Sequence, residues 1–420
     1  MPRTPRTTTH AARTAKPASS SGSRRGLTKP SAGRSQAAPA TGRNVGFWQK
    51  AFGGFTAWTV RTKFWKRLAL GIIAVILLAV GSMYGVAQWY IHEHAGEPTT
   101  VGVTFIPDYA RYYGLDARQT YTAILEDLNV KQVRLTSYWD SMEPEQGTFN
   151  FSELDWEMQM AQDHGVKVSL SLGLRQPRWP ECHMPGWASK MQGENAASEQ
   201  WKPALMDFIT QVVNRYKNSP ALDSYQLENE YFLKAFGQCT DFNRQRLVDE
   251  FNLVKSLDPD HTLVVSMSNN AIGTPVGDPK PDEYAISIYK RVWDKTITKR
   301  YFEYPIPAWY YAFRAGFVEL TTGRNSFIHE LQAEAWTPDP FGGTLTTPLA
   351  EQDKSMNPTI LTNRIKYGEA TGMKTLDLWG VEWWYWRKVK FNDPGLWDAA
   401  RAGIAASQQA NLELLQKKQP

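Results

Sequence analysis

The sequence predicts an α/β protein, a (β/α)8 or TIM barrel preceded by a disordered basic tail and one transmembrane helix. Three observations lead to this prediction: a basic segment without acidic residues, a long apolar run, and then an alternation of short apolar runs with longer amphipathic ones. The alternation predicts parallel strands joined by crossover helices. Eight such units close into a barrel of typically about 250 residues, which fits the length that follows the apolar run.

The first segment, residues 1–62, is predicted to be a disordered cytoplasmic tail. Residues 1–67 hold 14 of the 47 Lys and Arg residues and no Asp or Glu. Such a composition cannot bury enough apolar surface to offset the entropy lost when a backbone is ordered. The positive charge would suit nucleic acid or anionic lipid as a partner, but a solvated tail is the simpler interpretation.

The next segment, residues 66–91, is predicted to be a transmembrane helix that contacts the lipid bilayer. Residues 68–91 are 24 residues without a formal charge, and about 20 apolar residues span a bilayer core. A cleaved signal peptide is the alternative, but the 67 residues ahead are too long for an ordinary n-region. Lys and Arg residues before the run, with Trp89 and Tyr90 at its far end, predict a cytoplasmic N-terminus and an extracytoplasmic remainder.

The remainder is predicted to form the barrel, residues 98–405, and a polar C-terminal tail, residues 406–420. Beyond residue 67 the chain has 33 basic and 42 acidic residues, a formal charge of −9. This charge argues against nucleic acid as a ligand of the barrel. His92 and His94 lie in the short linker before the barrel and are given no specific role.

The eight predicted strands are the short apolar runs at 101–105, 131–139, 166–173, 222–231, 261–269, 283–289, 325–332 and 373–380. Amphipathic runs predict helices at 120–129, 154–165, 204–217, 244–257 and 360–371. Residues 290–324 form a long aromatic stretch that is predicted to be irregular. An open doubly wound sheet is the rival fold, but the first strand is not followed by the Gly-rich phosphate-binding turn that such folds usually have.

In a barrel of this kind the active site lies at the carboxyl ends of the strands. The candidate residues near these ends are Arg134, Trp179, Asn229, Glu230, Tyr289, Glu330, Glu334, Trp379 and Trp383. Two carboxyl groups in one pocket suit glycoside cleavage, because one protonates the leaving oxygen while the other meets the oxocarbenium-like carbon. Aromatic faces can stack on sugar rings. The predicted partner is therefore an oligosaccharide or polysaccharide.

Two motifs make the prediction more specific. LENEY, residues 227–231, resembles the acid/base motif of clan A glycoside hydrolases, nearest to the β-galactosidase-type families 35 and 42. WDSMEPEQGTFNFSELD, residues 139–155, resembles the segment after strand two in the same families. The resemblance implies that Glu230 is the acid/base and that Asn229 holds the substrate 2-hydroxyl.

The same resemblance implies a nucleophile on the seventh strand. Ile328-His329-Glu330 matches the expected pattern, so Glu330 is the candidate and Glu334 the alternative. Residues two apart on a strand point the same way, which would place Ile328 below Glu330 inside the barrel. Tyr289 matches a tyrosine that binds the nucleophile, and Arg134 matches a strand-two arginine, so both would stabilise the carboxylate of Glu330.

Several alternatives stay open. Glu228 alternates with Glu230 and suits a structural role better than a catalytic one. The tryptophans of WGVEWWYW, residues 379–386, suit either a sugar platform or core packing, and Trp379 is the better site candidate. A carbohydrate-binding barrel without turnover and a transglycosidase are the alternative functions.

Cofactor and metal chemistry are not predicted, since metal-binding spacings such as HExxH and paired CxxC do not occur. The only two cysteines are Cys182 and Cys239. An oxidising compartment would permit a disulfide between them. Two free buried thiols are the alternative, and the residues do not decide between the two.

Overall fold

The computed structural model describes residues 46–191, 200–234, 236–239, 241–268, 277–338 and 341–418, with side chains from Thr62 onward. The chain divides into two compact units, Met1–Gly71 and Ile72–Pro420. Helix α1 (Gly46–Glu93) begins within the segment predicted as a tail, whose residues 1–45 lie outside the described ones. Part of α1, Thr62–Glu93, is the one described helix that is long and apolar enough to cross a membrane.

Eight parallel strands close into a barrel, which confirms the predicted fold class. The strands follow one another around the barrel in chain order, and the last pairs with the first. Each lies within or overlaps one of the eight predicted runs. They are β1 (Thr100–Thr104), β2 (Gln132–Thr136), β3 (Lys167–Leu172), β4 (Leu222–Leu227), β5 (Thr262–Met267), β6 (Glu283–Ile288), β9 (Asn325–Gln332) and β10 (Thr375–Trp379).

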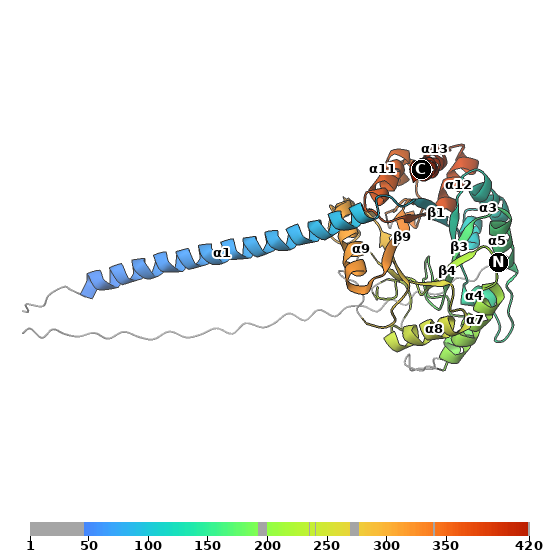
Figure 1. Cartoon of the computed structure of the whole chain (residues 1–420), viewed down its shortest axis with the longest axis horizontal. Coiled ribbons are helices and arrows are strands. Elements are labelled where there is room, and N and C mark those ends of the chain that lie inside the picture. The colour runs from blue at the N-terminus through green and yellow to red at the C-terminus, as the bar shows by residue number, and fades with distance from the viewer. Residues whose placement is uncertain are drawn as a thin grey trace, which may run out of the picture. The chain divides into compact units, whose positions relative to one another are not determined.

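The helices that follow α1 surround the ring of strands (Figure 1). Several begin at side chains that satisfy free backbone N–H groups: Asp116 accepts from Gln119, and Asn357 accepts from Ile360 with Pro358 at the first helical position. After α1 the helices are α2 (Pro107–Tyr112), α3 (Ala117–Glu126), α4 (Trp139–Met142), α5 (Ser152–Asp163), α6 (Gly186–Lys190), α7 (Lys202–Tyr216), α8 (Arg244–Leu257), α9 (Ala308–Thr322), α10 (Leu349–Gln352), α11 (Pro358–Glu369), α12 (Val381–Phe391) and α13 (Gly395–Lys418).

Residues 290–324 are not irregular as predicted. They contain an antiparallel hairpin, β7 (Arg291–Trp293) with β8 (Tyr301–Glu303), followed by helix α9. Tyr311, Ala315 and Val318 form the buried face of α9, and the helix ends at Gly323 with φ +68°. The sequence hides this helix because its outer face is also rich in aromatic residues, so no amphipathic period is visible.

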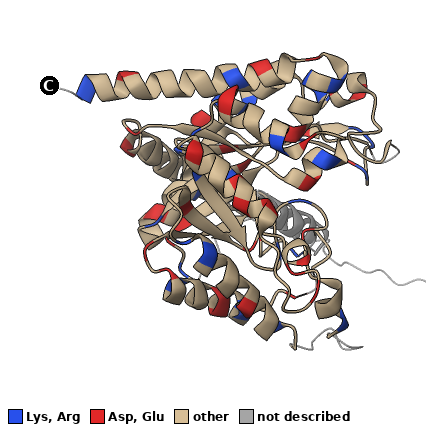
Figure 2. Cartoon of the chain, turned by 90° about the vertical axis from the view of Figure 1, so that its right-hand side faces the viewer, with Lys and Arg blue, Asp and Glu red and all other residues tan. Residues whose placement is uncertain are grey.

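The boundary predicted at residue 405 falls inside helix α13, which continues to Lys418 (Figure 2). The later turns of this helix contact the chain just before β1. The Asn411 side chain accepts from the Thr99 N–H at 2.8 Å and donates to the Thr99 carbonyl at 2.7 Å. Residues 406–418 therefore bind the start of the first strand. Figure 2 also shows acidic and basic residues mixed along the helices.

The inside of the barrel is polar, in contrast to the apolar layer between strands and helices. Asp377 on β10 is fully buried there, and burial raises the pKa of this carboxyl to about 7. Gly102 on β1 leaves room for it, because a Cβ at this position would lie 2.4 Å from Asp377 Oδ1. A side chain at position 102 would therefore displace a strand or the carboxylate.

The last turns of α1 pack against the barrel. Ala87 and Tyr90 are fully buried, and the Tyr90 hydroxyl donates to Asn325 Oδ1 at 3.0 Å. The prediction that Tyr90 marks a membrane interface is therefore wrong. His94 also has a role that the sequence did not suggest, since its ring nitrogens lie 2.9 Å from carboxylate oxygens of Glu97 and Glu319. Burial opposes protonation, but these hydrogen bonds outweigh it and raise the pKa of His94.

Candidate active site

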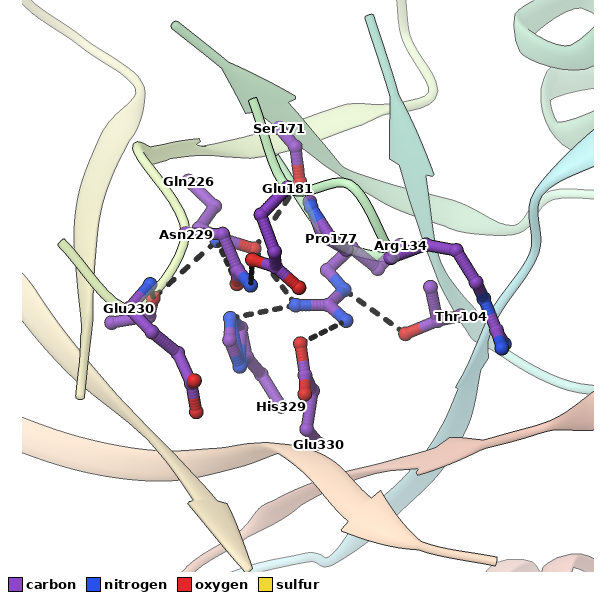
Figure 3. A network of polar contacts seen from close by, with 12 residues as sticks. Thr104, Arg134, Ser171, Pro177, Glu181, Gln226, Asn229, Glu230, His329 and Glu330 are labelled. Carbon is purple, nitrogen blue, oxygen red and sulfur yellow. Dashed lines mark hydrogen bonds and ion pairs between the residues drawn. The ribbon is translucent and has the colours of Figure 1, made fainter. Parts of the chain in front are cut away.

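Arg134 on β2 is the centre of a polar network inside the barrel (Figure 3). Its side chain is fully buried. Nε donates to Thr104 Oγ1 at 3.0 Å, and Nη1 donates to Gln226 Oε1 at 3.0 Å. Nη1 also lies 2.8 Å from His329 Nε2, and Nη2 donates to Glu330 Oε1 at 2.9 Å. The guanidinium of Arg134 thus connects β2 to side chains of β1, β4 and β9, and one of these side chains is the carboxylate of Glu330.

His329 and Glu330 are adjacent in sequence, yet both contact Arg134. The register explains this: Ile286 pairs with Ile328, but the next residue, Ser287, pairs with Glu330. One residue of β9 is thus skipped as in a β-bulge, and side-chain alternation is interrupted. Ile328 belongs to the main apolar cluster. The prediction that Ile328 lies below Glu330 inside the barrel is therefore wrong, and His329 takes that place.

Glu330 is held from a second side by Tyr289, which follows β6. The Tyr289 hydroxyl donates to Glu330 Oε2 at 2.7 Å. Burial raises the pKa of Tyr289 well above its usual value, and the charge of Glu330 raises it further. The phenol therefore stays protonated and acts as a donor. The two oxygens of Glu330 accept from different partners, which fixes the plane of the carboxylate.

Glu230 follows β4 and is also buried. Its N–H donates to Ser266 Oγ at 2.7 Å. Burial raises the pKa of Glu230 to about 7, and the nearby negative charge of Glu330 contributes in the same direction. The backbone at this turn is strained, because Glu228 and Glu230 have φ values of +54° and +42°. Glu230 is therefore a carboxyl group that holds its proton near neutral pH beside a second carboxylate.

Glu228 has a different environment from Glu230. Its oxygens accept from the N–H groups of Leu174 at 2.6 Å and Arg175 at 3.0 Å. Arg246 Nη1 also donates to Glu228 Oε1 at 2.7 Å. These contacts tie β4 to the loop after β3 and to helix α8. The carboxylate is fully engaged in holding the scaffold.

Asn229, between these glutamates, has a fixed amide. Its Oδ1 accepts from Gln226 Nε2 at 3.0 Å, and its Nδ2 donates to Glu181 Oε2 at 3.0 Å. Burial raises the pKa of Glu181 to about 8, although the charge of Arg175 opposes this. Sequence reasoning missed Glu181. The available signal was its position next to Cys182, which the structure joins to Cys239 in a disulfide.

The opening of the barrel at the carboxyl ends of its strands is called the mouth. The loop after β3 also reaches the opposite side of this mouth. Arg178 Nη2 donates to Glu334 Oε2, just after β9, at 3.0 Å. The guanidinium carbon lies 3.4 Å from the ring centroid of Tyr109 and 4.3 Å from that of Trp379. The Tyr109 hydroxyl donates to the other oxygen of Glu334. Glu334 therefore belongs to a second cluster, and Arg178 covers part of Trp379.

The three candidate tryptophans have different surroundings. Trp379 is 7% exposed and packs with Ile106 and Tyr138 at the mouth. Trp179 is 59% exposed on the loop after β3. Trp383 is fully buried, and its indole N–H donates to Gln352 Oε1 at 2.5 Å. The structure thus does not bring Trp383 to the mouth, where it was predicted to bind substrate, because it faces the core.

A metal site is not evident either. Within the ranges that the structure describes, no group of three or more His, Cys, Asp or Glu residues is placed to hold a metal ion. The chemistry available around Glu230 and Glu330 is that of two buried carboxyl groups, an arginine, a tyrosine and an amide.

Comparison with known proteins agrees with this chemistry. The model of glycoside hydrolase family 42, described as beta-galactosidase, matches residues 114–258. This range includes Asn229 and Glu230 but not Glu330. The chain is 28% identical over 209 residues to endo-1,4-beta-xylanase 1 of Humicola insolens, covering 46% of this chain and 43% of the relative. It is 23% identical over 175 residues to beta-galactosidase Bga of Halorubrum lacusprofundi, covering 37% and 25%.

Among solved structures, the beta-galactosidase from the psychrophilic Marinomonas ef1 has a TM-score of 0.51 at 14% identity, covering 76% of this chain and 60% of that one. This likeness concerns the fold. The chain spans less than half the length of the curated relatives it matches. Together, the family match, the relatives and the barrel support the predicted resemblance to clan A glycoside hydrolases, with a similarity to the β-galactosidase family over residues 114–258.

Proposed function

We propose that the protein is a membrane-anchored, extracytoplasmic, retaining β-glycosidase that hydrolyses O-glycosidic bonds by double displacement. One observation carries the proposal. Glu330 is held by Arg134 and Tyr289, and it lies close enough to Glu230 for its charge to raise the pKa of that buried carboxyl. One carboxylate is thus stabilised as an anion while the other keeps a proton, which is the division of roles that glycoside cleavage requires.

In the first step Glu330 attacks the anomeric carbon and forms a glycosyl ester. The bond from that carbon to the leaving oxygen breaks, and Glu230 gives its proton to this oxygen. In the second step Glu230, now ionised, takes a proton from water. The water oxygen attacks the anomeric carbon, the ester bond breaks, and Glu330 is released as a carboxylate. Two inversions leave the stereochemistry unchanged.

The neighbouring residues have supporting roles in this mechanism. Arg134 and Tyr289 orient the two oxygens of Glu330 and stabilise its charge before and after the ester forms. Asn229 is oriented by Gln226 and Glu181, and it would donate to the substrate 2-hydroxyl. Trp379, which Arg178 partly covers, and the exposed Trp179 on the loop after β3 would offer aromatic surface to a sugar ring. A transglycosidase would use the same ester, with a sugar hydroxyl in place of water.

The proposed location has separate support. The apolar part of α1 is long enough to span a bilayer, and the basic residues ahead of it favour a cytoplasmic N-terminus. The barrel would then lie outside the cytoplasm. A disulfide between Cys182 and Cys239 is compatible with that compartment.

The test is hydrolysis of aryl β-galactoside, glucoside, mannoside and xyloside by the full chain in detergent and by three variants. We expect Glu330→Gln and Glu230→Ala to lose roughly 10²-fold or more in kcat for one of these sugars. The exposed Glu303→Gln serves as the control. Azide should restore turnover in Glu230→Ala and give a β-glycosyl azide. Equal activity in all variants, or an α-configured azide, would contradict the mechanism.

The same experiment separates the alternatives. Added sugar acceptors that divert product from hydrolysis to new glycosides would favour a transglycosidase. Binding of an oligosaccharide without turnover of any substrate would favour a carbohydrate-binding barrel.

A further inference from the structure

We infer that the barrel touches the bilayer at a second place, where the β7–β8 hairpin binds anionic phospholipid headgroups. The inference rests on the membrane anchoring proposed above and is independent of the glycosidase activity. It follows from the path of α1 along the barrel, from the side chains exposed on α1, and from the composition of the hairpin turn.

The contacts between α1 and α9 fix the direction in which α1 leaves the barrel. The rings of Tyr84 and Trp309 lie 5.7 Å apart. Further along, Gly316 packs on Tyr90, since a Cβ at Gly316 would lie 3.0 Å from Tyr90 Cβ. His94 and Glu319 then lie 2.9 Å apart. Residue numbers increase together on both helices, so they run side by side in the same direction.

It follows that α1 leaves the barrel beside the N-terminus of α9. The hairpin β7–β8 is the segment immediately before this N-terminus, and Pro307 is the N-cap residue of α9. The hairpin and the anchor helix therefore emerge at the same edge of the barrel, which is the edge formed by the carboxyl ends of the strands.

The exposure of side chains along α1 indicates where the bilayer surface lies. Every described side chain from Lys63 to Ser82 is exposed, whereas Ala87 and Tyr90 are buried against the barrel. The uninterrupted run of exposed side chains thus ends at Ser82, just before Tyr84, which contacts Trp309. Aromatic side chains favour the boundary between headgroups and hydrocarbon. The start of α9 is therefore placed at the level of the headgroups.

The turn of the hairpin has the composition of a segment that binds an anionic membrane. Ile297 is 87% exposed, more than any other large apolar side chain described. Lys295, Lys299 and Arg300 surround it and are also exposed. The one acid of the turn, Asp294, accepts from backbone N–H groups of the turn itself. An apolar tip with three cations suits shallow insertion beside anionic headgroups.

The test uses single-cysteine variants of the full chain, labelled with an environment-sensitive fluorophore and reconstituted in vesicles that contain brominated lipid. The two native cysteines are joined to each other, so only the introduced thiol reacts under non-reducing conditions. Ile297→Cys reports on the hairpin and Leu77→Cys on the anchor. Leu415→Cys is the matched control, because it is 57% exposed on α13, whose Lys418 contacts Gly96 beyond the end of α1.

We expect the brominated lipid to quench the labels at 297 and 77 but not at 415. Quenching at 297 should increase when phosphatidylglycerol replaces part of the phosphatidylcholine. It should be lost when Lys295, Lys299 and Arg300 are changed to Glu, while quenching at 77 persists.

Each other pattern has a definite meaning. Quenching at 77 alone would overturn the hairpin inference and leave the anchor in place. Quenching at 297 alone would contradict the anchor and would also overturn the inference as stated, because the hairpin would then be the first membrane contact and not a second one. Quenching at neither position would overturn both, and quenching at all three would show that the barrel has no preferred face and overturn the inference.

Discussion

Arg134 donates to Glu330 across 2.9 Å, and both side chains are buried inside the barrel. Removing one partner of a buried ion pair costs about 3–5 kcal/mol, because the other charge is left without compensation. For Arg134→Met we therefore expect a loss of this size in the free energy of unfolding, together with a large drop in kcat.

The control for this variant is Arg215→Met. Arg215 pairs with Asp155 at 2.6 Å, but the side chains are 46% and 38% exposed. Exposed pairs contribute about 0–1 kcal/mol. Urea unfolding of both variants measures the difference. Equal losses in the free energy of unfolding would show that the buried pair stabilises the fold no more than the exposed pair does.

The pH dependence of hydrolysis should report on Glu230. This residue must be protonated to act as an acid, and its pKa is raised to about 7 by burial and by the charge of Glu330. We therefore expect kcat/KM for an aryl glycoside with a poor leaving group to fall above about pH 7. A 2,4-dinitrophenyl glycoside, whose leaving group needs no proton, should show a much weaker fall. The same fall for both substrates would assign the effect to another group.

Asp377 should make the protein less stable as the pH rises. Burial raises the pKa of this carboxyl from 3.8 to about 7 in the folded chain. The folded state therefore binds the proton more tightly than the unfolded state. Its stabilising contribution is fully present below pH 3.8 and is lost as the pH rises through 7. The size of the effect is up to about 4 kcal/mol.

The variant Asp377→Asn should remove this part of the pH dependence. Thermal unfolding at pH 5 and pH 8 should show a smaller decrease in the variant than in the wild type. Asp163→Asn, at an exposed position on α5, is the control and should behave as the wild type. A variant with the full decrease would exclude Asp377 as its source.

Arg178 should limit the size of the sugar that enters the mouth. Its guanidinium lies 4.3 Å from the Trp379 ring and pairs with Glu334 on the far side, so the loop after β3 crosses one end of the site. We expect Arg178→Ala to raise kcat/KM for an aryl disaccharide, relative to the aryl monosaccharide, by about tenfold, which corresponds to 1.4 kcal/mol. An unchanged ratio would mean that Arg178 does not close this end.

The fold could be predicted largely from the sequence because each barrel strand is a short run of apolar residues between polar turns. The positions of Glu230 and Glu330 follow from the same reasoning, since they lie at or near the ends of such runs. His329 could not be predicted as a partner of Arg134, because the skipped residue in β9 breaks the alternation that was assumed.

The path of the loop after β3 was also beyond the sequence. Glu181 and Arg178 reach the mouth through contacts with Asn229 and Glu334, which come from distant parts of the chain. Patterns among neighbouring residues in the sequence do not predict contacts between such distant segments. Trp383 was wrongly predicted for a different reason. The same aromatic run places Trp379 at the mouth and Trp383 in the core, and the sequence does not distinguish the two positions.

Because Ala87 and Tyr90 are buried against the barrel, the barrel cannot rotate about the end of α1 as it could on a flexible linker. A tethered enzyme sweeps a volume set by the length of its linker. Here α1 stays helical to Glu93, and β1 begins at Thr100 after a short turn that His94 pins to Glu319. With the part of α1 from residue 72 onward in a membrane, the mouth of the barrel would keep one height and one tilt relative to that part of the helix. Its reach would then come from lateral diffusion of the whole chain, so glycans would have to lie within the height of the barrel itself.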